Sequence, residues 1–219
     1  MPVADSAISH VPIALKRAGV MDYLDALELQ RSLHNEIADN QRENTLLLVE
    51  HPSVYTAGKR TQDHERPQDG TPVIDVDRGG KITWHGLGQL IGYPIVRLAK
   101  PTELVGFVRE IESALIVTCS ELGLTATRVE GRSGVWVVDN KGERKIAAIG
   151  IRVARGVTMH GFALNVEPDL APFQAIIPCG IEDAAVTSLA IELGRSISLE
   201  EVLPIVEKYM YESLAKVSR

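Results

Sequence analysis

Two cysteines, Cys119 and Cys179, are the first candidates for covalent chemistry, and their sequence contexts differ. Cys119 falls on the apolar stripe of an expected helix, where a thiol is an ordinary core group. Cys179 lies in IIPCGI, between a proline that restricts the backbone and a glycine that allows close approach. The residues alone leave two interpretations of Cys179 open: a reactive thiol, or a small apolar side chain in a turn.

A reactive thiol needs a neighbouring base or cation, because only a few per cent of an unperturbed thiol is ionised at neutral pH. Lys145 opens the run KIAAIGI, and strand alternation predicts that it shares a face with Ala147, Ile149 and Ile151. Apolar neighbours favour the neutral amine and would make Lys145 a base. The sequence alone favours the alternative, a lysine at the start of a strand whose ammonium reaches water.

The stretch RGGKITWHG at 78–86 has three glycines in nine residues, so its backbone is expected to turn or to be approached closely. His85 and His160 each precede a glycine, as expected of side chains that face a cleft; hydrogen-bonded structural histidines are the alternative. The six histidines show no metal-ligand spacing, so no metal site is expected. Neither GLGQLIG at 86–92 nor GK at 58–59 completes a nucleotide motif.

The composition is that of a globular protein with a substantial core. The chain has 219 residues, 45% of them hydrophobic and 24% charged, and we expect one domain over 1–219. A net charge of −6 disfavours nucleic-acid binding. The sequence shows no signal peptide and no apolar run long enough for a membrane span, and the two cysteines fit no disulfide framework. We therefore expect a cytoplasmic protein without a membrane partner.

Hydrophobic periodicity predicts the elements that must position these residues. Helices are expected over 22–39, from a cap at Thr102 to Gly123, and from a capping box at Ser198 and Glu201, despite Pro204. Expected strands are 45–50, 73–77, 81–83, 89–96 and 160–166, with a hairpin of 134–138 and 144–153. Helices at both ends with strands between them predict an α+β fold, with a mixed or antiparallel sheet and flanking helices.

Several motifs together resemble the lipoyl(octanoyl) transferases of lipoate biosynthesis. They cover most of the chain from 45 to 190 in the order that the family shows. They are EHPSVYTAG (50–58), RGGKITWHG (78–86), GQL (88–90), YP (93–94), RKIAAIGIRV (144–153), HGFALNV (160–166), PCGI (178–181) and VTSL (186–189). One departure is visible, because Leu87 stands where the family usually has a proline.

The resemblance implies an enzyme that moves an octanoyl group from acyl carrier protein to a lysine of lipoyl domains, in 2-oxo acid dehydrogenase complexes and the glycine cleavage H protein. It implies no cofactor, and the catalytic fold of biotin protein ligases and lipoate–protein ligases. Cys179 matches the acyl-thioester nucleophile, and Lys145 matches the lysine that lowers the thiol pKa and acts as a base. The residues that match the acyl-binding walls are Arg78, Gly79, Gly80, Lys81, Ile82, Thr83, Trp84, His85, Ala148, Ile149, Gly150, Gly161, Phe162 and Ala163.

Three other functions are considered beside this one. A lipoate or biotin ligase of the same fold would need a nucleotide and no nucleophilic cysteine. A non-catalytic lipoyl-binding module would need neither Cys179 nor Lys145 at these positions. A thioesterase would pass the acyl group to water in place of a lysine.

Charge also predicts where an acidic acyl carrier protein would dock. Residues 128–155 hold seven basic and three acidic residues within a chain that is negative overall. We expect this hairpin, with Arg144 and Arg152, to steer the donor. The alternative is a solvated hairpin with scattered charges.

Overall fold

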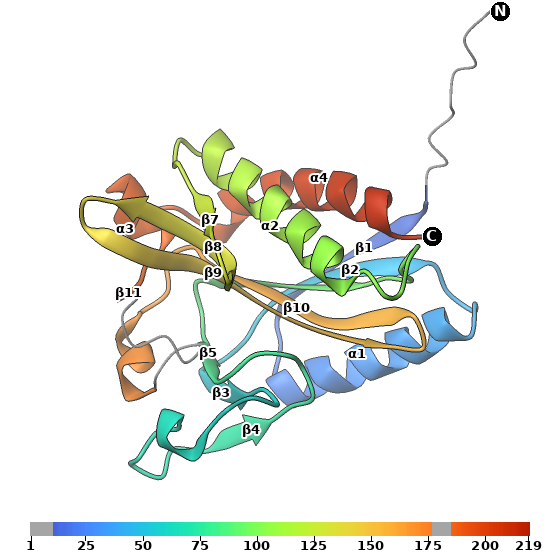
Figure 1. Cartoon of the computed structure of the whole chain (residues 1–219), viewed down its shortest axis with the longest axis horizontal. Helices are drawn as coiled ribbons and strands as arrows, with labels where there is room; N and C mark the ends of the chain where they lie inside the picture. The colour runs from blue at the N-terminus through green and yellow to red at the C-terminus, as the bar shows by residue number, and fades with distance from the viewer. Residues whose placement is uncertain (1–10, 177–184) are drawn as a thin grey trace, which may run out of the picture.

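The computed structural model describes residues 11–176 and 185–219, and its elements form the expected α+β fold (Figure 1). The main sheet has eight strands. Seven of them lie in the order β1 (Ile13–Val20), β2 (Asn44–Glu50), β6 (Gln89–Ile95), β10 (Val157–Asn165), β9 (Gly142–Ala154), β8 (Arg132–Asp139) and β7 (Thr127–Val129), and β11 (Ala185–Val186) also pairs with β9. The β1–β2 and β11–β9 pairs are parallel and the other neighbours antiparallel, so the predicted mixed sheet is confirmed.

Helices cover both faces of this sheet, as Figure 1 shows. The longer helices α2 (Leu104–Glu121) and α4 (Leu199–Val217) pack together over one face, near the short α3 (Leu189–Leu193), and α1 (Tyr23–Ala38) lies against the other face. The strand β2 explains why: Leu46 and Leu48 join the core on the α2–α4 side, whereas Leu47 and Val49 join the core beneath α1. A strand that buries both faces reads as a continuous apolar run, which TLLLV is.

A second, three-stranded sheet in the order β4 (Val73–Asp75), β3 (Val54–Ala57) and β5 (Thr83–His85) lies beside the main one. It has its own small core, which includes Tyr55, Ile82 and Trp84 and extends to the short 3₁₀ helix at Ala171–Ala175. A second 3₁₀ turn, Asp63–Glu65, precedes β4. The small sheet therefore anchors both ends of the segment that carries the glycine-rich stretch.

Most of the predicted elements are confirmed, but one strand boundary and one helix cap are wrong. The strand expected at 81–83 is instead Thr83–His85, because the Lys81 carbonyl accepts a hydrogen bond from the Arg78 guanidinium and is not part of a ladder. Thr102 does not cap α2, since it lies in the turn that the Glu103 N–H closes onto the Lys100 carbonyl, and Glu103 is the residue before the helix. Ser198 does cap α4, which continues through the exposed Pro204.

The predicted face of Lys145 is wrong for two of its three expected neighbours, and a β-bulge is the reason. The β8–β9 register shifts between the Val135–Ala147 and Trp136–Lys145 pairs, so one residue of β9 is unpaired. Ala147 and Ile151 belong to the main core, whereas Lys145 lines a cavity on the opposite face with Ala148 and with Ile149, as predicted for Ile149. Regular alternation from Lys145 would have placed these side chains together.

Among the described strands, the sequence patterns missed β1 and the short β3, β7 and β11. β1 lies at the sheet edge with most of its residues exposed, so it has no continuous apolar run. None of the helices that the structure describes is long and apolar enough to cross a membrane.

Candidate active site

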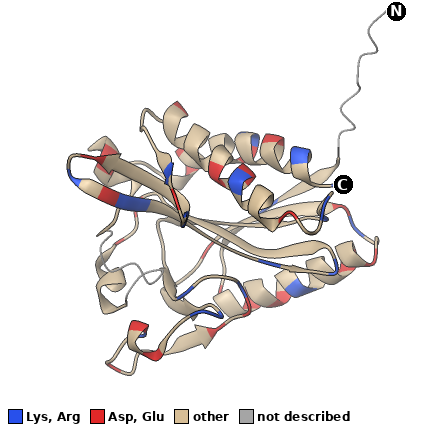
Figure 2. Ribbon diagram, viewed as in Figure 1, with Lys and Arg blue, Asp and Glu red and all other residues tan. Residues whose placement is uncertain are grey.

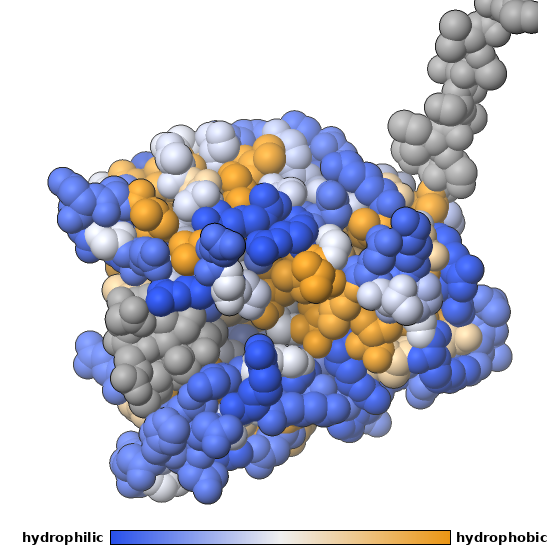
Figure 3. Space-filling view, viewed as in Figure 1, coloured by the Kyte–Doolittle hydropathy of each residue, from blue (hydrophilic) through white to orange (hydrophobic). Residues whose placement is uncertain are grey.

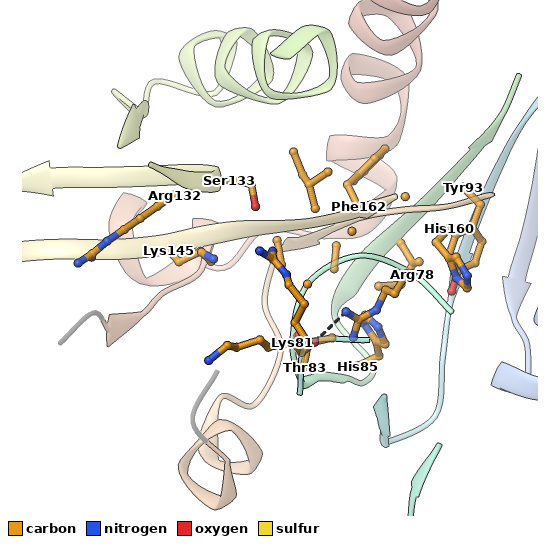
Figure 4. Close-up of a pocket in the computed structure, with 18 of the residues that line it drawn as sticks. Arg78, Lys81, Thr83, His85, Tyr93, Arg132, Ser133, Lys145, His160 and Phe162 are labelled. Atoms are coloured by element: carbon orange, nitrogen blue, oxygen red, sulfur yellow. Dashed lines mark hydrogen bonds between the residues drawn. The ribbon is translucent and has the colours of Figure 1, made fainter. Parts of the chain in front are cut away.

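A cavity of about 240 Å³ lies where the glycine-rich stretch crosses the main sheet (Figure 4). We call it the trough. Its floor is the adjacent strands β9 and β10, and its wall is the segment that leads into β5. Lys145 and Arg132 lie at one end in Figure 4, and Tyr93 and His160 lie at the other. Segments from the first, middle and last thirds of the chain are therefore brought to one site.

The trough collects most of the residues that the sequence singled out. Lining residues from that set are Arg78, Gly80, Lys81, Thr83, His85, Lys145, Ala148, Ile149, Gly150, Gly161, Phe162 and Ala163. Gly79, Ile82 and Trp84 do not line it. Gly79 donates its N–H to the Ile151 carbonyl, at 3.1 Å, and Ile82 and Trp84 pack in the core of the small sheet. Strand alternation separates them from Thr83 and His85, which face the cavity.

Other lining residues were not assigned to the site from the sequence. They are Tyr23, Arg60, Ile91, Tyr93, Gly131, Arg132 and Ser133, together with His160, for which the sequence predicted only that it faces a cleft. Among them, His160 carries a backbone signal in the structure, because its φ of 59° lies in the left-handed region that side chains rarely adopt. Its N–H donates to Oε1 of Gln30, at 3.0 Å, which holds that conformation. Tyr23 and Tyr93 carry no local sequence signal that separates them from core aromatics.

Close backbone approach explains the glycines of the trough. A Cβ at Gly150 would lie 2.9 Å from Cδ of Arg78 and 3.0 Å from the Gly79 carbonyl oxygen, and one at Gly161 would lie 1.9 Å from the Gly92 carbonyl oxygen. Gly80 has a φ of 88°, so a side chain there would be strained even where space exists. These glycines let the 78–80 segment lie directly on the sheet.

The Arg78 side chain holds this segment in place. It is 8% exposed, and its guanidinium donates to the carbonyl and hydroxyl oxygens of Thr56 and to the carbonyls of Gly79 and Lys81. The bond to Lys81, at 2.8 Å, is drawn in Figure 4. Arg78 therefore satisfies loop carbonyls that have no ladder partner.

At one end of the trough lies Lys145, which is 8% exposed. Its Nζ lies 4.6 Å from the centroid of the Trp136 ring, and within residues 11–176 and 185–219 it makes no ion pair with a carboxylate. A π face at this distance stabilises an ammonium ion. Val186 pairs with Lys145 in the β11–β9 ladder, and the Thr187 N–H donates to the Lys145 carbonyl. The predicted nucleophile Cys179 lies outside the described residues.

The predicted core role of Cys119 agrees with its environment. It is 0% exposed within the main core, and burial raises the pKa of its thiol to about 12. A thiol in this state is unreactive at neutral pH.

A directed chain of hydrogen bonds runs from the Lys145 end to His85. The Thr187 carbonyl can only accept, so the Asn165 amide donates to it, and Asn165 Oδ1 accepts from Nε2 of Gln89, at 2.7 Å. Oε1 of Gln89 is then the acceptor for Nδ1–H of His85, also at 2.7 Å. Burial lowers the pKa of His85 to about 3, so the ring is neutral and its Nε2 is an acceptor.

Two further histidines, His51 and His160, are also held by hydrogen bonds within the protein. Nδ1–H of His51 donates to the Met21 carbonyl, so Nε2 of His51 accepts from the Tyr93 hydroxyl, at 2.7 Å. His160 Nε2 bonds to Asp77, at 2.8 Å, and Asp77 also pairs with Arg152. Burial lowers the pKa of His51 and that of His160, where Asp77 opposes the shift.

The loop after His85 is well held although it has Leu87 in place of a proline. The Gly88 N–H donates to the Glu50 carboxylate, at 2.8 Å, and the Gly88 carbonyl accepts from the N–H groups of Val166 and Glu167. Leu87 is 58% exposed and contributes little to this anchoring.

The arginines expected to dock an acidic partner are engaged within the molecule. Arg144 forms ion pairs with Asp139 and Glu192, and Arg152 pairs with Asp77. Figure 2 shows acidic residues beside the basic ones along the β8–β9 hairpin. The basic excess of this stretch is therefore largely neutralised, and reversing Arg144 would break a structural contact.

Comparison with known proteins gives the family. Residues 22–211 match the family model described as the lipoyl protein ligase A/B catalytic domain. An octanoyltransferase of Salinispora tropica is 59% identical over 200 residues, an alignment that covers 90% of this chain and 94% of that relative. An octanoyltransferase of Mycobacterium sp. (strain KMS) is 60% identical over 206 residues, which cover 93% of this chain and 86% of the relative. The chain belongs to the octanoyltransferase family.

Solved structures of lower identity agree with this family's expected fold. The bipartite lipoate protein ligase of Thermoplasma acidophilum has a TM-score of 0.71 at 18% identity, covering 94% of this chain and 84% of that one. The biotin protein ligase of Aquifex aeolicus, with biotin and ATP, has a TM-score of 0.54 at 17% identity, covering 93% and 70%. The likeness of this octanoyltransferase family member to the ligases is one of fold.

The buried neutral state of His85 predicts how stability depends on pH. Since the folded pKa is about 3 and the unfolded value about 6.5, the unfolded chain binds the extra proton between these values, and stability falls as pH falls below 6.5. From pH 7 to pH 5 this histidine should cost about 2 kcal/mol. Urea unfolding at both pH values should show that His85→Gln loses less stability than wild type. The exposed His64→Gln should behave as wild type; an equal loss in His85→Gln would show that His85 is protonated when folded.

Proposed function

We propose that this octanoyltransferase moves an octanoyl group from acyl carrier protein to the lysine amine of a lipoyl domain, through a thioester on Cys179. The observation that supports this proposal most directly is the placement of Lys145. A buried ammonium without a carboxylate partner among the described residues lies at the end of a mainly apolar trough. Such a cation would lower the pKa of a thiol near it and generate the thiolate nucleophile.

The reaction has two acyl transfers that share the same groups. First, the Cys179 thiolate attacks the octanoyl carbonyl; the new C–S bond forms, the bond to the carrier's thiol breaks, and the carrier's sulfur takes a proton from the Lys145 ammonium. Next, the acceptor lysine amine attacks the Cys179 thioester, an amide forms, and the Cys179 thiolate leaves. Lys145, now neutral, accepts the proton of the amine, so the enzyme returns to its starting state.

The trough suits a single medium-length acyl chain. Its apolar lining includes Ile91, Ile149, Phe162 and Ala163. Its volume of about 240 Å³ lies below the roughly 300–1,000 Å³ typical of pockets for drug-sized ligands. Each methylene removed from water contributes about 0.8 kcal/mol, so an octanoyl tail would supply several kcal/mol of binding.

A ligase function is less well supported than transfer. The sequence has no complete phosphate-binding motif, and relatives at 59–60% identity are octanoyltransferases whereas the lipoate and biotin ligases share 15–18%. Acceptors for the transferred group would be the lipoyl domains of 2-oxo acid dehydrogenase complexes and the glycine cleavage H protein.

We propose that the cations that dock the donor lie in the loop after β3 and not in the hairpin. Lys59 and Arg60 are exposed and form no ion pair within the described parts of the chain, and Arg60 reaches the rim of the trough. The face drawn in Figure 3 is hydrophilic along the small sheet, with an apolar area above it. An acidic carrier would contact this basic loop while its arm enters the trough.

The first prediction concerns the nucleophile. After incubation with octanoyl-acyl carrier protein, intact-protein mass spectrometry should show one octanoyl adduct, and peptide mapping should place it on Cys179. Cys179→Ala should form no adduct and transfer nothing. Cys119→Ala is the matched control and should keep the adduct, because the Cys119 thiol is buried in the core. An adduct on any other residue would contradict the mechanism.

The second prediction concerns Lys145. Lys145→Met should shift the pH profile of Cys179 alkylation upward and reduce transfer by about 10²- to 10⁴-fold, because both the cation and the base are lost. Lys141→Met, in the exposed hairpin turn, is the control and should match wild type. Since Cys119 is 0% exposed, the alkylation signal belongs to Cys179. An unchanged profile would make Lys145 structural.

The third prediction concerns docking. Lys59→Glu with Arg60→Glu should raise KM for octanoyl-acyl carrier protein relative to that for a small uncharged octanoyl thioester, by about tenfold at low salt. The difference should shrink at physiological ionic strength, where screening acts beyond about 8 Å. Lys16→Glu, a single charge reversal on the edge strand β1, is the control for an exposed cation away from the trough and should leave both KM values as in wild type. Equal effects on both donors would exclude docking by this loop.

A further inference from the structure

The far end of the trough is polar, although an acyl tail is apolar. Tyr23, His51, His85 and Tyr93 form one ring cluster there, with centroids 5.3–6.1 Å apart, and His160 lies at the same end. The Tyr23 and His85 rings are stacked, at an interplanar angle of 9°. Aliphatic side chains would be the simplest lining for the end of an acyl slot, so this polarity needs an explanation.

The polar groups of the cluster differ in how they are satisfied. The Tyr93 hydroxyl and both ring nitrogens of His51 are used in bonds within the protein. Among the residues that the structure describes, the Tyr23 hydroxyl and Nε2 of His85 have no hydrogen-bond partner, and both residues line the trough. The His85 nitrogen is an acceptor, because its Nδ1–H is committed to Gln89. A donor and an acceptor thus remain available at one end of the cavity.

Strand register shows how far this end lies from Lys145. Tyr93 is level with Gly161, because Phe162 pairs with Gly92, and Gly161 pairs with Gly150. Gly150 is five residues from Lys145 along β9, or roughly 16 Å at the usual strand rise. An extended octanoyl chain covers only about 9 Å with standard bond lengths. A dodecanoyl chain would bring its last methylenes against the Tyr23–His85 pair, whereas an octanoyl chain would stop short of it.

We propose that the Tyr23 hydroxyl and Nε2 of His85 form a hydrated polar end that limits the length of the acyl chain, an inference that rests on the proposed function. Water held by this pair makes hydrogen bonds that a methylene cannot replace. A longer chain displaces that water and leaves both groups unsatisfied, which cancels the gain from burying additional carbon. Long chains are then disfavoured by the loss of these hydrogen bonds, and the cavity need not be sterically closed.

The same geometry predicts that the far end of the trough binds a chain that ends in a hydroxyl better than a chain that ends in a methyl. A hydroxyl at the far end of a twelve-carbon chain can donate to Nε2 of His85 and accept from Tyr23. The polar end therefore distinguishes 12-hydroxydodecanoyl from dodecanoyl groups of nearly the same size.

The test compares kcat/KM for octanoyl, dodecanoyl and 12-hydroxydodecanoyl pantetheine thioesters. Tyr23→Phe should raise the dodecanoyl-to-octanoyl ratio about tenfold, which corresponds to about 1.4 kcal/mol. It should lower the wild-type preference for 12-hydroxydodecanoyl over dodecanoyl by a similar factor. Tyr211→Phe, on α4 and outside the trough lining, is the matched control and should leave both ratios as in wild type. Unchanged ratios in Tyr23→Phe would overturn the proposal.

Calorimetry with free octanoate and dodecanoate separates this inference from the proposed function, because binding needs no transfer. Wild type should bind octanoate more tightly than dodecanoate, and Tyr23→Phe should reduce this ratio of affinities by about tenfold. If wild type transfers no acyl group but this shift is observed, the polar end stands and the transferase function fails. If transfer is observed without the shift in binding or in kcat/KM, the polar end is wrong and the function stands.

Discussion

The site depends on the contact between the Arg78–Gly80 segment and strand β9. The Gly79 N–H bonds to the Ile151 carbonyl, and Gly150 has no room for a Cβ beneath Arg78. If the segment were lifted by one side chain, the wall of the trough would separate from its floor. The Arg78 guanidinium then fixes the loop by donating hydrogen bonds to its carbonyls. The glycines permit the close contact, and the hydrogen bonds of Arg78 hold the segment in one conformation.

The sequence predicted the fold class and the long elements because their signals are periodic and local. Helix α1 and strand β2 are read directly from spacing and from a continuous apolar run. Short strands such as β5 depend on partners far away in the chain, so their ends were misplaced. Lys145 shows the same limit, because the bulge in β9 is set by pairing with β8 and separates Lys145 from Ala147 and Ile151.

Prediction of the site residues rested on motifs, and the structure explains which of them could be read. The cluster of glycines beside an arginine at 78–86 is uncommon, so it can be recognised in the sequence. Tyr23 and Tyr93 reach the trough from α1 and β6. Their sequence contexts are those of ordinary core aromatic residues. Ile82 and Trp84 lie within the motif and yet support the small sheet, because a strand presents alternate residues to opposite sides.

The direction of the buried hydrogen bonds connects the two ends of the trough. A backbone carbonyl, that of Thr187, sets the orientation of the Asn165 and Gln89 amides, and these in turn fix the tautomer of His85. The N–H of the same Thr187 bonds to the Lys145 carbonyl. Thr187, which directly follows β11, therefore bonds both to the strand that carries Lys145 and to the amide chain that orients His85. In a low-dielectric interior, reversing any amide in this chain would leave a buried donor facing a donor, so the arrangement has one stable direction. The hydrogen-bond chain links the Lys145 end of the trough to a neutral acceptor at the other end through side-chain amides and backbone groups alone.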